Sequence, residues 1–157
     1  MFIKMNQRGF TLVEITITVV VIGLLAAIAI PSLLRVRINA NEGAIKADLK
    51  TFSEACESFR SSQNPPAYPD NIDALVTPAA GPGYIDASWN TLTKHGYTLT
   101  YTPATYSFSL LVVPTVASQT GINTYCIDQG GAIVGSVNGA DAPTAAETGC
   151  TGGTPII

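Results

Sequence analysis

The sequence predicts an α+β fold, in which a long N-terminal helix packs on a roughly four-stranded antiparallel sheet. A run of twenty uncharged, mostly apolar residues, Ile15 to Leu34, leads into a segment whose apolar residues recur at helical spacing. Two pairs of short segments with strand character follow, and each pair is joined by turn residues. Because the helical pattern comes first and the strand patterns follow it, the order is that of the α+β class.

Length and charge limit the classes of protein that fit. The chain has 157 residues, so about 120 remain outside an N-terminal membrane segment, enough for one compact domain. The formal charge of −3 gives no sign of a nucleic-acid site. The second half is expected to be a mildly acidic folded body, because after Asn64 the only basic residue is Lys94. The acidic residues there are Asp70, Asp73, Asp86, Asp128, Asp141 and Glu147.

The apolar run is as long as a bilayer core is thick. At 1.5 Å per residue, the run spans ~30 Å as a helix, and a buried helix of a soluble protein seldom runs so far without a charge.

A secretory signal is a second reading, with cleavage after "AIA" at 27–29. The carboxylate of Glu14 and the position of Pro31, two residues beyond that cut, both argue against it. A plain membrane anchor is a third reading, and basic residues at both ends of the run leave its orientation open.

A fourth reading comes from the stretch "RGFTLVEITITVVVIGLLAAIAIPSL", which begins at Arg8. It resembles the class III leader and N-terminal helix of type IV pilins and their pseudopilin relatives, and is most like a type IV major pilin precursor. The residues shared with that pattern are Gly9, Phe10, Thr11, Leu12, Glu14, Gly23 and Pro31. The resemblance implies that a prepilin peptidase cuts between Gly9 and Phe10 on the cytoplasmic side, and that the new Phe10 amine is N-methylated. The apolar run is then retained, unlike that of a secretory signal.

The resemblance also implies a division of the chain and a route for it. Residues 1–9 form the leader, residues 10–37 the transmembrane and filament-core helix, and residues 38–157 the globular pilin domain. The precursor lies in the inner membrane, and the pilus assembly platform moves the processed chain into an extracellular filament at the cell surface. The main partner is the chain itself, as further copies in a helical homopolymer.

Glu14 lies at the head of the apolar run, where an unpaired carboxylate is costly to bury. Cleavage before Phe10 creates an ammonium four residues away, which can pair with Glu14 within one helix or between neighbouring copies in a filament core. The resemblance implies the pairing between copies, and so an assembly role for Glu14. A negative side chain in the first turn also suits the helix dipole. The alternative is that Glu14 has no role in assembly and is solvated at the level of the lipid headgroups.

The run contains two weak points for a helix. Pro31 has no N–H for the carbonyl of Ala27, and Gly23 is a weak helix former. We therefore expect kinking or local melting of the helix between Gly23 and Pro31, and the resemblance implies that this stretch unwinds on assembly. Thr16 and Thr18 are expected to bond back to carbonyls of the same helix.

Beyond the run, apolar residues mark one face of a continuing helix: Ile38, Ile45, Leu49, Phe52, Cys56 and Phe59. The opposite face carries charged residues: Glu42, Lys46, Lys50, Glu54, Glu57 and Arg60. The apolar face is expected to pack on the core, with Cys56 as a buried thiol. Prolines soon after Ser62 end the helix, which would therefore extend from Phe10 to about Ser62.

Two hairpins are predicted after a long connection, residues 64–90, in which "PDNIDALV" has room for one or two helical turns. The first hairpin pairs "GYTLTYT" with "YSFSLLVV" around "PAT", and one face of its strands carries Tyr97, Leu99, Tyr101, Tyr106, Phe108, Leu110 and Val112. The second pairs "TYCID" with "AIVGSV", and Asp128 begins its turn. The tail from Asn138 onward is expected to be weakly structured apart from Cys150.

Three cysteines allow three single pairings. An exported domain permits disulfides. We favour Cys126–Cys150, because that bond would hold a tail with little else to fix it.

No residue pattern indicates catalysis, so the chain is not expected to be an enzyme or to use a cofactor or a metal. The single histidine, His95, lies beside Gly96 at a strand start and is expected on a surface loop. A calcium site near Asp128 would need several oxygen ligands that the sequence does not clearly assemble.

The function that the sequence supports best is a structural subunit of a type IV pilus, used in adhesion, surface motility or DNA uptake. A type II secretion pseudopilin is the alternative. Residues 86–101 lack the "DPWG"-like segment usual in major pseudopilins, and Glu14 argues against the initiating minor pseudopilin. The third hypothesis is a membrane-anchored domain that never polymerises, and N-methylated Phe10 would separate it from the other two.

Overall fold

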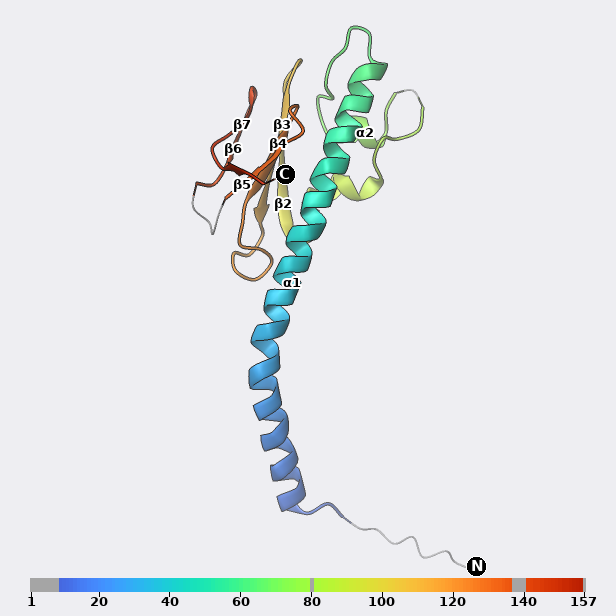
Figure 1. Ribbon diagram of the computed structural model, residues 1–157. Helices are drawn as coiled ribbons and strands as arrows, with labels where there is room; N and C mark the ends of the chain where they lie inside the picture. Colours follow the sequence, from blue (N-terminus) through green and yellow to red (C-terminus); the bar gives the residue numbers. More distant parts are fainter. Residues whose placement is uncertain (1–8, 80, 137–140, 157) are drawn as a thin grey trace, which may run out of the picture. The chain divides into compact units, whose positions relative to one another are not determined.

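The computed structural model describes residues 9–79, 81–136 and 141–156. The chain divides into two compact units, Met1–Val36 and Arg37–Ile157. The helix α1 (Leu12–Ser62) contributes to both units (Figure 1). Residues 1–8 of the expected leader, and residues 138–140 at the start of the expected tail, lie outside the described residues.

The described part of the first unit is the N-terminal half of α1. The helix begins at Leu12, two residues later than predicted, and stays helical through Gly23 and Pro31. Its large apolar side chains are exposed all round the helix. A helix that is apolar on every side belongs in a surrounding of lipid or of other apolar helices.

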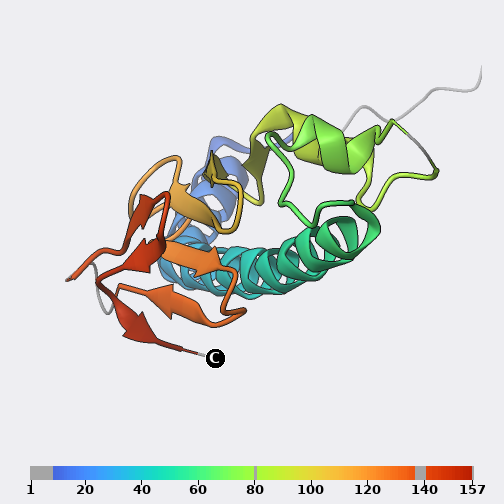
Figure 2. The ribbon, with the colours of Figure 1, turned by 90° about the horizontal axis from the view of Figure 1, so that it is seen from above.

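In the second unit, the rest of α1 lies along one face of a six-stranded antiparallel sheet (Figure 2). The strand order is β1-β2-β3-β4-β5-β8, and every neighbouring pair is antiparallel. The strands are β1 (Thr93–Lys94), β2 (Tyr97–Pro103), β3 (Phe108–Pro114), β4 (Tyr125–Asp128), β5 (Ile133–Gly135) and β8 (Thr154–Pro155). A separate hairpin consists of β6 (Thr144–Ala146) and β7 (Gly149–Thr151).

The core forms between the apolar face of α1 and the sheet, as predicted. The register of β2 and β3 sets Leu99 opposite Val112, both buried. The ring of Phe52 on α1 lies at the centre, 5.1 Å from Trp89, 5.5 Å from Tyr101 and 6.1 Å from Phe108 between ring centroids. Cys56 is also buried, as expected, and burial raises the pKa of its thiol well above the usual range, with Glu57 adding to the rise.

Both predicted hairpins are present, but the prediction of four strands is too low. The tail, expected to be weakly structured, instead forms β6, β7 and β8. These strands are two or three residues long and contain no large aliphatic or aromatic residue, so they carry no apolar alternation that a sequence pattern could detect. Tyr106 is not a strand residue either: it lies in the β2–β3 turn, 76% exposed, and that turn is closed by a hydrogen bond from the Ala104 amide to the Ser107 carbonyl.

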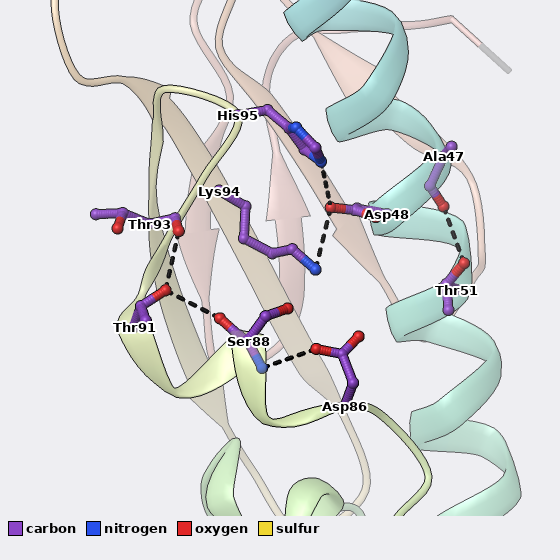
Figure 3. Close-up of polar contacts among 9 residues, drawn as sticks. All are labelled: Ala47, Asp48, Thr51, Asp86, Ser88, Thr91, Thr93, Lys94 and His95. Carbon is purple, nitrogen blue, oxygen red and sulfur yellow. Dashed lines mark hydrogen bonds and ion pairs between the residues drawn. The ribbon is translucent and has the colours of Figure 1, made fainter.

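The connection between α1 and the sheet holds more structure than predicted. The short helix α2 (Asp73–Val76) falls within the predicted turn or two. The 3-10 helix η1 (Ala87–Thr91) was not predicted, and it carries Trp89 into the core. Asp86 caps η1, because its carboxylate accepts a hydrogen bond of 2.7 Å from the Ser88 amide (Figure 3).

Candidate functional site

Thr11 and Glu14 together cap the start of α1. Glu14 Oε2 accepts hydrogen bonds from the Thr11 amide at 2.8 Å and from the Thr11 hydroxyl at 2.7 Å. In return, the Thr11 hydroxyl accepts a hydrogen bond of 3.2 Å from the Glu14 amide. This reciprocal arrangement is a capping box, and its signature, Thr followed three residues later by Glu, is present in the sequence. Sequence reasoning assigned Glu14 to assembly but missed this role of Thr11.

The capping box leaves part of Glu14 available. Both hydrogen bonds that the carboxylate accepts are to Oε2, and among the described residues none is donated to Oε1. The Phe10 side chain is 86% exposed, and a Cβ added to Gly9 would meet no atom of the described residues within 4 Å. As far as the described residues show, the Gly9–Phe10 peptide therefore lies in open surroundings, close to a carboxylate with a free acceptor.

α1 is the one helix among the described residues that is long and apolar enough to cross a membrane. Two polar side chains within the apolar run are satisfied inside the helix, as predicted. The Thr16 hydroxyl donates to the Leu12 carbonyl at 2.7 Å, and the Thr18 hydroxyl donates to the Ile15 carbonyl at 2.8 Å. Such internal bonds lower the cost of placing a hydroxyl in an apolar environment.

Glu42 was predicted to lie on the charged face of α1, opposite the apolar face, but nothing in the sequence predicted that a loop would cover it. It is partly buried, and its Oε1 accepts hydrogen bonds from the backbone amides of Ile122 at 3.0 Å and Asn123 at 3.2 Å. Its Oε2 accepts from the Tyr125 hydroxyl at 2.8 Å and from the Asn123 side chain at 3.4 Å. Glu42 therefore fastens the loop between β3 and β4 to the helix.

The pKa of Glu42 reflects two opposing effects. Desolvation by the surrounding protein raises it. The hydrogen bonds from Ile122, Tyr125 and Asn123 stabilise the charged form, and together they outweigh the desolvation. The net result is a pKa below the ordinary value of 4.5, so the carboxylate is charged at neutral pH.

Asp48 on α1 pairs with two basic side chains at the start of the sheet (Figure 3). Its Oδ2 lies 3.3 Å from Lys94 Nζ and 3.2 Å from His95 Nε2. The Lys94 ammonium also lies 4.2 Å from the centroid of the Trp89 ring. His95 is in the turn before β2, as expected, and its ring points toward Asp48 on α1 (Figure 3). These contacts join the helix to the edge of the sheet.

Cys126 on β4 and Cys150 on β7 form a disulfide bond, the pairing favoured from the sequence. Asp128 adds a second link between the same two strands: its Oδ2 accepts from the Cys150 amide at 3.0 Å, while its Oδ1 accepts from the Gly130 amide at 2.8 Å in the β4–β5 turn. Gly149 makes this approach possible, because its φ is +126° and a Cβ there would lie 2.7 Å from Asp128 Oδ2. Within the described residues, no group of three or more acidic, histidine or cysteine side chains is arranged to hold a metal ion.

Comparison with known proteins identifies the N-terminal motif. The profile of the prokaryotic N-terminal methylation motif matches residues 4–30. The chain is 42% identical over 59 residues to the type IV major pilin protein PilA of Myxococcus xanthus, covering 38% of this chain and 27% of that protein. It is 36% identical over 72 residues to the type IV wide pilus major component PilA4 of Thermus thermophilus, covering 46% of this chain and 53% of that protein.

Relatives of a second kind also match. The type II secretion system core protein G of Pseudomonas aeruginosa is 32% identical over 97 residues, covering 60% of this chain and 64% of that protein. The chain thus spans from about a quarter to just under two thirds of the length of these three relatives. No solved structure matches the chain. The similarity therefore joins this chain to pilins and to secretion core proteins alike.

Proposed function

We propose that this chain is a structural subunit that polymerises into a type IV pilus after a prepilin peptidase removes residues 1–9. The observation that carries the proposal is the N-terminal methylation motif, in which Glu14 heads a helix that is apolar and exposed on every side. The similarity to major pilins of two organisms supports it. A long helix packed on an antiparallel sheet is the arrangement that the resemblance implied.

The proposed processing changes the charge at the start of the helix. Hydrolysis of the Gly9–Phe10 amide releases the leader as a carboxylate and leaves an amine on Phe10. That amine is mostly protonated near neutral pH, since α-amino groups have a pKa of about 7.7–8.0, and N-methylation keeps the positive charge. The mature subunit then carries an ammonium four residues before Glu14, at the head of the apolar run.

Glu14 then has a partner when subunits assemble. Its Oε2 is occupied by Thr11, and its Oε1 is the acceptor left for the Phe10 ammonium of a neighbouring copy. In an apolar filament core such a pair removes two uncompensated charges at once. Before assembly, the apolar part of α1 holds the subunit in the inner membrane. The assembly platform then delivers the subunit to a filament at the cell surface.

The experiment is to replace Glu14 by Ala. The variant should stay in the membrane, because its apolar run is intact, but should form few or no filaments when sheared surface material is viewed by electron microscopy. Glu54→Ala is the matched control, since Glu54 is an exposed acid on the same helix and filaments should form normally. Normal filament numbers with Glu14→Ala would contradict the assembly role. Mass spectrometry of the mature N-terminus tests the processing, with N-methylated Phe10 as the expected result.

A type II secretion pseudopilin is the second candidate, favoured by the similarity to core protein G. Both candidates polymerise through the same helix, so Glu14→Ala does not separate them. The late disulfide, Cys126–Cys150, favours the pilin. Surface filaments that disappear with the gene would support the pilus, whereas loss of protein secretion without loss of filaments would support the pseudopilin.

A further inference from the structure

A cavity of about 580 Å³ lies between the connection after α1 and strand β2 in the second unit. Its apolar lining includes Leu92, Leu99 and Tyr101. Leu92 is 48% exposed although it is a large apolar residue, and its backbone has a positive φ of 54°. Non-glycine residues seldom adopt this conformation, so the fold holds Leu92 at the cavity at some energetic cost.

The rim of the cavity is acidic. Asp70 and Asp73 line it together with Asn90, and both aspartates are exposed. The Asn90 side chain donates a hydrogen bond of 3.3 Å to Asp73 Oδ1. No salt bridge in the described part of the chain involves either aspartate, whereas Asp48 and Glu57 both have cationic partners. An apolar floor with an acidic rim suits a cation on an aliphatic stem.

Two such cations are exposed just after the apolar run. Arg35 and Arg37 are exposed, and in the described part of the chain neither forms a salt bridge. Arg60 and Lys94, by contrast, each pair with an acid of the same chain. Because the two arginines are two residues apart on a helix, they project about 200° apart, so each can face a different neighbour.

We propose that this cavity receives Arg35 or Arg37 of a second copy of the chain. The inference rests on the proposed function, because burying the apolar run of one copy among others brings its flanking arginines against the globular surfaces of those copies. The arginine stem lies on Leu92, Leu99 and Tyr101, and the guanidinium bonds to the aspartates on the rim. The charge distribution supports this occupant: after Asn64 the chain has six acids and one base, so its distal body attracts cations.

Engineered disulfides test the contact directly. The native cysteines should not interfere with this test, because Cys126 and Cys150 are bonded to each other and Cys56 is buried. Arg37→Cys and Asp73→Cys are combined in one full-length chain, as are Arg35→Cys and Asp73→Cys. After mild oxidation of sheared filaments, at least one of these chains should give a ladder of covalent multimers that a reductant removes. Lys50→Cys with Asp73→Cys is the control and should give none, because Lys50 is also exposed but lies within the globular part of the helix.

Charge exchange is the second arm, for the case in which cysteine variants do not assemble. Asp70→Arg with Asp73→Arg, or Arg35→Asp with Arg37→Asp, should each lower filament yield about tenfold, the change in an equilibrium constant that 1.4 kcal/mol produces. The four substitutions together should restore most of the yield.

The outcomes separate this inference from the proposed function. Wild-type chains that form no filament refute the proposed function, and the inference falls with it. Wild-type filaments with neither a disulfide ladder nor rescue by charge exchange overturn the inference alone. A small cationic molecule could instead block disulfide formation at Asp73→Cys while the arginine variants have no effect. That result would assign the cavity to a small ligand and would also overturn the inference.

Discussion

The strongest structural prediction concerns Glu42→Ala. The substitution removes the acceptor for two backbone amides, the Tyr125 hydroxyl and the Asn123 side chain. A hydrogen bond to a charged group contributes about 1.5–3 kcal/mol. Water can replace Glu42 at the exposed Ile122, and the bond from the Asn123 side chain is long, so two bonds dominate: those from the Asn123 amide and the buried Tyr125. We expect the free energy of unfolding to fall by about 3 kcal/mol.

The assay uses the only tryptophan. Trp89 is buried against Phe52, so its fluorescence reports unfolding of the globular part of the full chain in detergent under guanidinium. Glu42→Ala should lower the midpoint of unfolding with the slope unchanged. Glu54→Ala is the control, because surface substitutions usually change stability by less than about 0.5 kcal/mol. Equal effects of the two substitutions would refute the claim that Glu42 fastens the loop.

The same carboxylate predicts a pH dependence. The pKa of Glu42 is lower in the folded protein than its ordinary value of 4.5, so the unfolded chain binds a proton more readily than the folded one. The stabilisation is therefore complete above about pH 4.5 and is lost as the pH falls through the lower folded pKa. Glu42→Gln cannot titrate, and the difference in stability between wild type and this variant should shrink over that acidic range. A difference that stays constant from neutral pH into acid would contradict the assigned hydrogen bonds.

Three further substitutions test the rest of the globular unit. Replacing Cys126 and Cys150 by Ser removes a disulfide between residues 24 apart in the sequence. The free energy of unfolding should fall by about 3–4 kcal/mol, measured from the guanidinium midpoint under non-reducing conditions. Gly149→Ala should destabilise by more than about 1 kcal/mol, because a Cβ would meet the Asp128 carboxylate, and a higher thermal midpoint would contradict this. Phe52→Ala should cost about 3–5 kcal/mol, with loss of near-ultraviolet circular dichroism, since three aromatic rings surround Phe52.

The parts of the fold that could be predicted are those with a repeating pattern over many residues. The apolar face of α1 recurs every three or four residues and correctly identified the core positions from Ile38 to Cys56. The alternation in β2 placed Tyr97 and Leu99 on the buried face. Strands β6, β7 and β8 were missed because each is two or three residues long and is held by long-range contacts. One such contact is the hydrogen bond from the Ser109 hydroxyl to the Ala146 carbonyl, 37 residues away.

The same distinction applies to the polar contacts. The Thr11–Glu14 cap joins residues three apart, so its pattern is present in the local sequence. Glu42 finds its partners about 80 residues away, and nothing in its neighbourhood distinguishes it from Glu54 on the same helix. Which charged residues of an amphipathic helix become buried depends on the loop that folds over them, and only the tertiary structure specifies that.

On the proposed function, Glu14 explains why assembly is favoured over remaining in the membrane. The apolar part of α1 is buried equally well by lipid tails and by neighbouring helices. Burial of apolar surface therefore gives little preference for the filament. The Glu14 carboxylate differs, because the bilayer core offers it no cation, whereas a neighbouring copy offers the Phe10 ammonium. Packing between helices and this charge pair then supply the preference. It follows that exchanging one apolar residue of the run for another of equal size should alter filament yield much less than the loss of a single carboxylate at Glu14.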